Sequence, residues 1–531
     1  MSRLKSVKSL TEICMDFILE NKDFFYKRYT PREPKDGVDA LDSVDPAINS
    51  FDHLRKLPII KTDKKNLIVM TTLTKLFLNS ATELLEELIR RLRDRVKEAR
   101  IFEIIPFLTL LMTPRLRTLD LTALRQENDI SGVLHMASIR SLNLETLLFD
   151  YNKYLYGGNF YFIPKFQKLR KLDISSCKAG DDCFNLIGIN CPDLRELFVK
   201  YGEVSDDGIR KLCVVGNCKL ICILYLENCS KITTKGIQMA LDNLPQLSVL
   251  FYNSLLERLA EIAQNAIDQK LSLPKYSLTV LHMLHYTIYK TGNLRQSVLL
   301  CPNVTEVYLT TWAGLRDTDL LSLLSLENIY TIEITTGVLF IEGLLPLPLD
   351  IDRKLSFVGL VPLLKKFGSC LKRLRIGNQF LVDNPLPVII EFCPNLESLA
   401  LDHCKTTQST RTEVKRPTLQ KLKKLTLEYC NSISLDDLLT LLSSPSLSYI
   451  FISHCKNLTE NVLQRVANLH GFRNLEYLYL HYCNSLTKTA IDFFFKESYQ
   501  LREITVKSDL YHFRYYHVPV IEDNFDFNVM D

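Results

Sequence analysis

The sequence predicts an α/β solenoid in which short strands alternate with helices, and three observations lead to this fold class. First, one apolar pattern recurs from residue 116 onward with a period of about 26 residues: an apolar residue, two variable positions, an apolar residue, one variable position and a third apolar residue. Second, its last three positions alternate as in a strand, and helical spacing follows, as in Asp206–Leu212 and Asp436–Leu442. Third, one such unit cannot bury its own apolar face, so stacked copies must share a core.

The repeats hold their register over residues 111–507, which chance clustering of leucines would not do. Most spacings between copies lie between 25 and 28 residues. We expect the strands to line a concave side and the helices a convex side. The fifteen copies begin at Leu116, Leu144, Leu169, Leu194, Ile221, Leu247, Leu278, Val304, Ile329, Leu371, Leu396, Leu422, Leu447, Leu475 and Leu501.

Composition excludes several classes of protein. The 531 residues include 65 Lys+Arg and 61 Asp+Glu, and 47% are hydrophobic, which excludes a largely disordered chain. Without long basic runs, neither nucleic acid nor a membrane surface is favoured as a partner. The longest apolar run, Ile104–Met112, has nine residues and is too short to span a membrane. The 15 Cys track the repeat, which predicts reduced thiols and an intracellular location, in the cytoplasm or nucleus.

Cysteines occupy two fixed places in the repeat. One closes the strand segment, as at Cys177 and Cys483, and another precedes the next repeat, as at Cys191 and Cys393. Together with turns such as Ile232–Ile237, this pattern resembles the cysteine-containing subclass of the leucine-rich repeat family, which is typical of F-box leucine-rich repeat proteins. Cys is small and readily buried, so it fits where the chain turns from strand toward helix.

Catalytic motifs are missing from the sequence. There is no phosphate-binding Walker loop, no Gly-x-Ser-x-Gly, no His-Glu-x-x-His and no paired Cys-x-x-Cys. A metal site at Cys213, Cys218 and Cys222 is an alternative to packing, but two of the three fall at positions set by the repeat. We expect a protein that is not an enzyme and that has no cofactor or metal.

Strand positions that alternate with the buried leucines would carry aromatic side chains on the concave side. The candidate partner-binding residues are the densest group, Tyr449, Phe451, Tyr477, Tyr479 and His481. Others lie earlier, at Phe198, Tyr225, Phe251, His282 and Tyr308, and a column before the closing Cys holds His403, Tyr429, His454 and Tyr482. Exposed rings anchor protein interfaces. The alternative is cross-strand packing under the aromatic tail Tyr511–His517.

Two departures from the repeat are also predicted. Between Ile329 and Leu371 the spacing is 42 residues, so an insertion is expected near residues 337–365. Its Gly343–Asp350 segment contains prolines that cannot continue a helix, and it is either a binding loop or a neutral surface insertion. Residues 508–531 would form a C-terminal tail.

Residues 1–110 have a different composition and are expected to form a helical region. Leu67–Val96 has the apolar spacing of an amphipathic helix. Near the start of the chain, Leu10, Cys14 and Ile18 are spaced by four residues and would share one helical face. Ser9 with Glu12 forms a capping box that would begin this helix. Anchors at such spacing suit docking of a helix into a groove.

The segment Ser9–Ile18 matches the BC-box pattern, and in the proteins that it resembles this helix docks into Elongin C. A BC-box followed by leucine-rich repeats resembles the ZYG and ZER substrate receptors of cullin-RING ubiquitin ligases. The resemblance implies a non-catalytic receptor that binds Elongin C, with Elongin B, and a cullin, and that holds a protein substrate. This chain lacks their armadillo repeats, so their substrate specificity is not carried over.

Two features of the N-terminal region leave alternatives open. Leu57–Ile60 lies where a cullin-selecting segment or an F-box could begin, but the sequence turns polar at Lys61–Asn66. The helix at Ser9–Ile18 could instead cap the first repeat. The chain would then be a leucine-rich repeat scaffold unrelated to ubiquitin, or an F-box-like adaptor.

Overall fold

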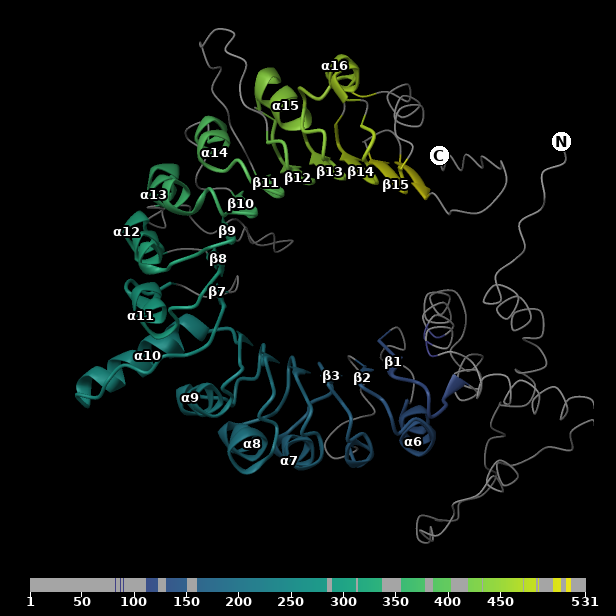
Figure 1. Cartoon of the computed structure of the whole chain (residues 1–531), viewed down its shortest axis with the longest axis vertical. Coiled ribbons are helices and arrows are strands. Elements are labelled where there is room, and N and C mark those ends of the chain that lie inside the picture. Colours follow the sequence, from purple (N-terminus) through teal and green to yellow (C-terminus); the bar gives the residue numbers. More distant parts are fainter. Residues whose placement is uncertain are drawn as a thin grey trace, which may run out of the picture. The chain divides into compact units, whose positions relative to one another are not determined.

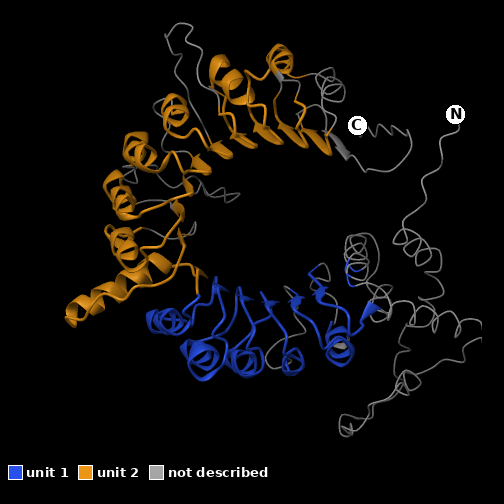
Figure 2. Ribbon diagram, in the orientation of Figure 1, with its two compact units in different colours: residues 1–246 blue, residues 247–531 orange. Residues whose placement is uncertain are grey.

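The structure is a computed structural model. It describes residues 82, 86, 89, 111–122, 130–149, 160–283, 289–311, 314–336, 355–377, 385–402, 419–431, 433–470, 472–483, 486, 500–507 and 512–516. The chain divides into two compact units, residues 1–246 and residues 247–531 (Figure 2). Each is treated separately below.

Unit 1 alternates strands with helical segments (Figure 1). Strands β1 to β5 lie side by side in chain order, and each pairs in parallel with the next. Its elements are β1 (Thr118–Asp120), α6 (Ser131–Arg140), β2 (Thr146–Leu148), η4 (Ile163–Lys165), β3 (Lys171–Asp173), α7 (Asp181–Asn190), β4 (Glu196–Phe198), α8 (Asp206–Ile209), the π-helical η5 (Arg210–Val215), β5 (Ile223–Tyr225) and α9 (Thr234–Asn243).

Unit 2 continues the alternation and contains a longer sheet. Strands β7 to β15 are parallel and follow chain order, whereas β16 runs antiparallel to β15 at the edge. Its elements are β6 (Val249–Phe251), α10 (Leu255–Asp268), β7 (Val280–Met283), α11 (Asn293–Leu300), β8 (Glu306–Thr311), α12 (Asp317–Leu320), η6 (Leu321–Ser325), β9 (Thr331–Thr336), α13 (Phe357–Phe367), β10 (Arg373–Gly377), α14 (Leu386–Phe392), β11 (Ser398–Asp402), β12 (Lys424–Glu428), α15 (Leu435–Leu442), β13 (Tyr449–Ser453), α16 (Glu460–His470), β14 (Tyr477–His481), β15 (Glu503–Lys507) and β16 (His512–Tyr516).

The predicted repeat register is confirmed. Each of β1 to β15 begins two residues after the first apolar residue of its copy, as β3 does at Lys171 after Leu169. The apolar positions of that copy, Leu169, Leu172 and Ile174, are fully buried, while the residues between them are partly exposed. Within unit 2 the helices lie on one side of the strands (Figure 1). The fold is that of leucine-rich repeats.

The closing Cys of a repeat holds the previous strand in place. The thiol of Cys229 donates to the carbonyl oxygen of Val199 at 3.0 Å, and Cys430 does the same to Leu401 at 3.5 Å. The residue before the Cys has a left-handed φ, 59° at Asn228 and 54° at Tyr429, which turns the chain away from the strand. Cys suits this place because it is small, apolar and still a weak hydrogen-bond donor.

A carboxylate links the helix starts of successive repeats. Asp206 accepts hydrogen bonds from the backbone nitrogen of Thr233 at 2.8 Å and from its Oγ1 at 2.6 Å. Asp181 with Ser205, and Asp317 with Ser356, repeat the arrangement.

A glycine follows three residues after each of these Ser or Thr residues. A Cβ on Gly236 would overlap Oδ1 of Asp206, and Gly208 and Gly359 meet the carboxylates of Asp181 and Asp317 in the same way. The glycines therefore make room for the carboxylates, a role that the sequence pattern did not reveal.

The structure describes few residues of the predicted N-terminal region and only the later part of the predicted insertion. Of residues 1–110, only 82, 86 and 89 are described, and Ile89 is buried. Residues 337–354 of the predicted insertion lie outside the described residues, whereas its later part includes α13, the helix of that repeat, with Leu360 and Leu364 fully buried. Among the residues described, no helix is both long and apolar enough to cross a membrane.

Replacing Gly236 with Ala should destabilise the protein, although Gly→Ala inside a helix is usually stabilising. The added methyl displaces Asp206 from its two hydrogen bonds with Thr233, the N-cap residue of α9, and we expect a loss of about 1–3 kcal/mol. Thermal unfolding followed by circular dichroism would measure it. The control is Gly180→Ala, because nothing lies within 4 Å of that position. Equal melting temperatures for the two variants would contradict the steric role.

Candidate functional site

The candidate site is the open face of the unit 2 sheet, meaning the face turned away from the helices. Alternate residues of each strand point to this face. Because neighbouring parallel strands are in register, equivalent positions form rows across the sheet, as Tyr449 does with Tyr477 and Phe451 with Tyr479. The first, third and fifth residues of each strand therefore form three rows.

The structure gathers the predicted aromatic residues into one patch, defined as Tyr449, Phe451, Tyr477, Tyr479 and His481. The ring centroids of Tyr449 and Tyr479 are 5.5 Å apart, and those of Phe451 and His481 are 5.0 Å apart in an edge-to-face arrangement. All five side chains are half-buried. The patch thus combines fixed ring positions with accessible apolar surface.

The phenols of Tyr449 and Tyr479 are neutral near pH 7. Burial raises the pKa of Tyr479 to about 12, with a hydrogen bond to Glu503 adding to the effect. Burial also raises the pKa of Tyr449. The Tyr479 hydroxyl donates to Glu503, and its oxygen can still accept a hydrogen bond from a partner while the ring makes apolar contact.

The C-terminal segment extends the sheet beside this patch. Residues 512–516 form β16, whose backbone pairs with β15 from Glu503↔Tyr516 to Lys507↔His512. This strand is two places away from β14 in the sheet. The alternative that the aromatic tail crosses the patch is therefore wrong for residues 512–516, which continue the sheet at its edge.

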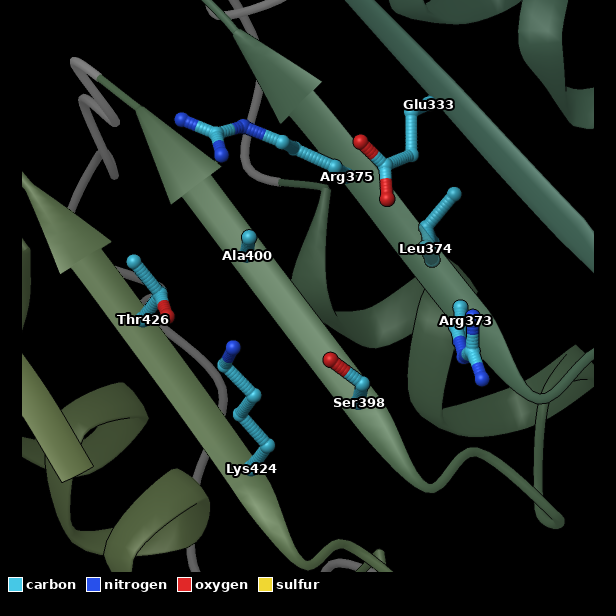
Figure 3. Close-up of a pocket in the computed structure, with 8 residues that line it drawn as sticks. All are labelled: Glu333, Arg373, Leu374, Arg375, Ser398, Ala400, Lys424 and Thr426. Carbon is cyan, nitrogen blue, oxygen red and sulfur yellow. The ribbon is translucent and has the colours of Figure 1, made fainter. Parts of the chain in front are cut away.

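A charged hollow lies on the same face, from β9 to β12 (Figure 3). Its empty volume of about 340 Å³ includes space open to solvent, so it is a shallow depression of the sheet face and not an enclosed pocket. Short side chains on β11 and β12 create it, because larger residues at these positions would fill the space. The polar and small side chains that line it are Glu333, Arg373, Arg375, Ser398, Ala400, Lys424 and Thr426.

Arg375 forms an ion network above β11. Its Nη2 is 3.0 Å from Oδ2 of Asp402 and 3.2 Å from Oε1 of Glu428. Figure 3 shows its side chain extending from β10 over the neighbouring strand that carries Ala400. Burial opposes the charge of Arg375, but the nearby carboxylates outweigh it and raise the pKa of the guanidinium.

Two carboxylates near Arg375, Glu333 and Glu428, have raised pKa values. Burial raises the pKa of Glu333, and Arg375, Arg373 and Lys424 partly offset that rise. Burial and then Asp402 raise the pKa of Glu428, again against the effect of Arg375.

Two cations of the hollow make no ion pair with any residue that the structure describes. Arg373 and Lys424 are both exposed, and they stand on either side of Ser398 in the first row. Lys424 places its Nζ 4.6 Å from the ring centroid of Tyr449. This cation–π contact joins the hollow to the aromatic patch.

A ladder of rings occupies the ends of three strands. Tyr429 stacks on His454 with centroids 4.4 Å apart, and His454 stacks on Tyr482 at 4.9 Å. Each has a left-handed φ, between 51° and 55°, so the ring leaves the strand where the chain turns. The fourth predicted member, His403, lies outside the described residues.

The other predicted rings also meet in register. Phe198 stacks on Tyr225 at 4.7 Å in unit 1, and Phe251 stacks on His282 at 3.9 Å in unit 2. His282 lies in register with Tyr308, as predicted, but only 1% of the residue is exposed, so its ring is not accessible to a partner. Burial lowers its pKa to about 3, and its Nε2 accepts a hydrogen bond from the backbone of Tyr252.

The described cysteines are free thiols. Cys213 and Cys218 donate separately to the carbonyl oxygens of Ile209 and Cys191, each at 3.1 Å. In the described part of the chain, no group of three or more His, Cys, Asp or Glu side chains is placed to hold a metal ion. Burial raises the pKa of Cys191 and Cys393 to about 12, so both stay protonated.

The candidate Elongin C contacts Leu10, Cys14 and Ile18 lie outside the described residues, as do Leu57–Ile60.

No protein-family model matches the chain, and no curated protein does. Similar solved structures include a chain from a crystal structure of the yeast Rad7 and Elc1 complex, 13% identical, with 91% of this chain and 96% of that chain covered and a TM-score of 0.42. Another is from a crystal structure of the TLR13–ssRNA13 complex, 17% identical, with 76% of this chain and 52% of that chain covered and a TM-score of 0.32. The chain thus spans about half of the TLR13 chain. The assignment of the fold rests on the repeats described above.

The charged hollow was missed at the level of sequence, although the repeat register contained it. Arg373, Ser398 and Lys424 each stand two residues after the first apolar residue of a copy. Aligning the copies would have placed them in one row. Charged and small side chains are common at exposed strand positions, so residue type alone gives no signal there.

Replacing Arg375 with Gln should destabilise the protein more at neutral than at acidic pH. Without the guanidinium, the raised pKa values of Glu333 and Glu428 rise further. Such carboxyls lose their stabilising contribution as pH increases through the folded-state pKa, so we expect a loss of about 1–2 kcal/mol near pH 7 that shrinks on acidification. Urea unfolding over a pH series would measure it.

The control for that series is Arg502→Gln. Arg502 is 63% exposed at its side chain and pairs only at the surface with Glu476, so its loss should cost little at any pH. A destabilisation by Arg375→Gln that is independent of pH would contradict the electrostatic account.

Proposed function

We propose that this chain is a non-catalytic substrate receptor of a cullin-RING ubiquitin ligase. In this proposal the open face of unit 2 holds a protein, and the N-terminal box docks on Elongin C, with Elongin B and a cullin completing the assembly. The observation that carries the protein-binding role is the half-buried aromatic patch on β13 and β14.

The patch has the chemistry of a protein interface. Tyrosine rings bury large apolar area with few rotatable bonds, and their hydroxyls find partners at the same time. Parallel strands on both sides fix the rings of Tyr449 and Tyr477, so a partner would meet a preorganised surface. The adjoining charges on β10 to β12 supply polar specificity around an apolar centre.

The absence of catalysis is supported by the protonation states. Nucleophilic cysteines need a lowered pKa, whereas burial raises the pKa of Cys301 and Cys483 to about 12. His282 is buried and neutral, and its ring packs on Phe251. Free thiols also suit a reducing compartment, so we place the protein in the cytoplasm or nucleus.

The docking half of the proposal rests on the sequence. Leu10, Cys14 and Ile18 recur every four residues, and Ser9 with Glu12 would begin the helix at the motif. If the box caps the repeats instead, the chain is a scaffold that binds proteins through the same open face. A further alternative is an F-box-like adaptor, with the F-box beginning at Leu57.

Substituting Leu10→Ser and Cys14→Phe together should abolish recovery of the chain with co-expressed Elongin B and Elongin C. Burying Leu10 is worth about 1.5–3 kcal/mol, so affinity should fall at least tenfold. Co-purification followed by quantitative gel analysis measures this. Asp16→Ala, on the other side of the predicted helix, is the control. Equal recovery of wild type and double variant would contradict docking through the box.

Replacing Tyr477 and Tyr479 with Ala should remove the bound protein while the repeats stay folded. Loss of two interface rings costs about 2 kcal/mol or more each, or roughly thirtyfold in affinity per ring. Affinity purification with quantitative mass spectrometry would compare this variant with Tyr477→Phe/Tyr479→Phe, which keeps the rings. If both variants retain the same proteins equally, the patch is not the binding surface. Loss of the folded circular dichroism spectrum in the Ala variant would show that the rings are structural.

A further inference from the structure

The rows of the open face separate the charges around the hollow. In the first row, Arg373, Ser398 and Lys424 are neighbours across three strands. In the third row Glu333 stands beside Arg375. The acids Asp402 and Glu428 lie in the fifth row. Positive charge therefore collects at the first row and negative charge at the fifth.

The first row holds its two cations apart. Strand spacing is about 4.8 Å, so the backbones of Arg373 and Lys424 are about 10 Å apart with Ser398 between them. The short Ser398 and Ala400 leave open space at this point (Figure 3). The two long side chains can therefore reach an anionic group seated over Ser398.

No carboxylate of a described residue forms an ion pair with Arg373 or Lys424. Asp402 and Glu428 are engaged by Arg375, and Glu397, next to Ser398 in the sequence, pairs with Lys423 at 2.9 Å. Glu333 faces the hollow from β9, where burial raises its pKa and the cations Arg375, Arg373 and Lys424 partly offset that rise. The backbone nitrogen of Ser398 donates to Lys372, but its hydroxyl makes no hydrogen bond to a described residue and can donate to a ligand.

The surroundings favour one isolated anionic group over a polyanion. Two unpaired cations match a single phosphate or carboxylate. A nucleic-acid strand would carry further phosphates past Glu333, Asp402 and Glu428, and these carboxylates would repel it. A polypeptide with one acidic side chain can cross the first row and then lay apolar residues on the aromatic patch, which Lys424 adjoins through Tyr449.

We propose that the charged hollow between β9 and β12 receives one anionic side chain, a phosphate monoester or a carboxylate, of the polypeptide bound on the open face. Arg373 and Lys424 grip the anion from both sides, and Ser398 donates from the floor. This rests on the proposed function, because the anionic group belongs to the protein that the aromatic patch holds. The receptor would thus select partners by a charged residue placed beside an apolar segment.

The test uses the full chain and three fluorescent degenerate peptide pools of equal length, which differ only in a central phosphoserine, glutamate or serine. Fluorescence anisotropy measures binding of each pool to wild type, Arg373→Gln/Lys424→Gln, Tyr477→Ala/Tyr479→Ala and the control Arg502→Gln/Lys507→Gln. The control also removes two charges from the sheet, but on β15 and the residue before it. A single-stranded oligothymidylate of equal length is the fourth probe.

We expect wild type to bind an anionic pool at least about tenfold more tightly than the serine pool, with the preference falling as salt rises. Arg373→Gln/Lys424→Gln should erase the difference between the anionic pools and the serine pool, and the control should keep it. Preference for phosphoserine alone assigns a phosphate, and preference for both pools shows that a carboxylate suffices.

Other outcomes overturn the inference in distinguishable ways. Equal binding of all pools, lost in Tyr477→Ala/Tyr479→Ala, refutes the anion site and leaves the proposed function standing. If no pool binds, or if Tyr477→Ala/Tyr479→Ala does not weaken binding, both the anion site and the proposed function are refuted. Tighter binding of the oligothymidylate, lost in Arg373→Gln/Lys424→Gln, assigns the hollow to nucleic acid instead.

Discussion

Each repeat can bury its leucines only against the next repeat, and every other feature of the chain depends on this constraint. A single strand–helix unit has a core on one side and nothing to cover it. Neighbouring units must therefore keep a common register, and polar contacts between repeats reinforce it. Cys229 does so at the strand end and Asp206 at the helix start. Because the register is so constant, residues far apart in sequence form straight rows on the open face.

Periodicity made most of the fold predictable. The apolar pattern located the start of β3 from Leu169 and of β14 from Leu475, because burial recurs at fixed positions in every copy. It could not reveal why Gly236 is a glycine. That reason lies in a carboxylate 30 residues earlier in the sequence, at Asp206, and contacts of this kind follow from the stacking of repeats, not from any single copy.

The candidate site was only half visible in the sequence for a related reason. Aromatic residues such as Tyr477 and Tyr479 stand out by type, whereas the hollow is defined by what is small. Ser398 and Ala400 matter because longer charged side chains stand beside them. His282 stands at an equivalent strand position, yet only 1% of it is exposed and its ring stacks on Phe251. Residue type and strand position do not reveal the size and charge of the side chains on the neighbouring strands.

The antiparallel strand β16 has a consequence for self-association. Parallel repeats can in principle continue without limit, because each edge strand offers its backbone groups to another strand of the same direction. Pairing of Lys507 with His512 reverses the strand direction at this edge of the unit 2 sheet. Because β16 occupies the edge of β15, a second molecule cannot extend the parallel repeats there by pairing with β15 and could add a strand only against β16. The strand therefore discourages end-to-end association that continues the parallel repeats at this edge.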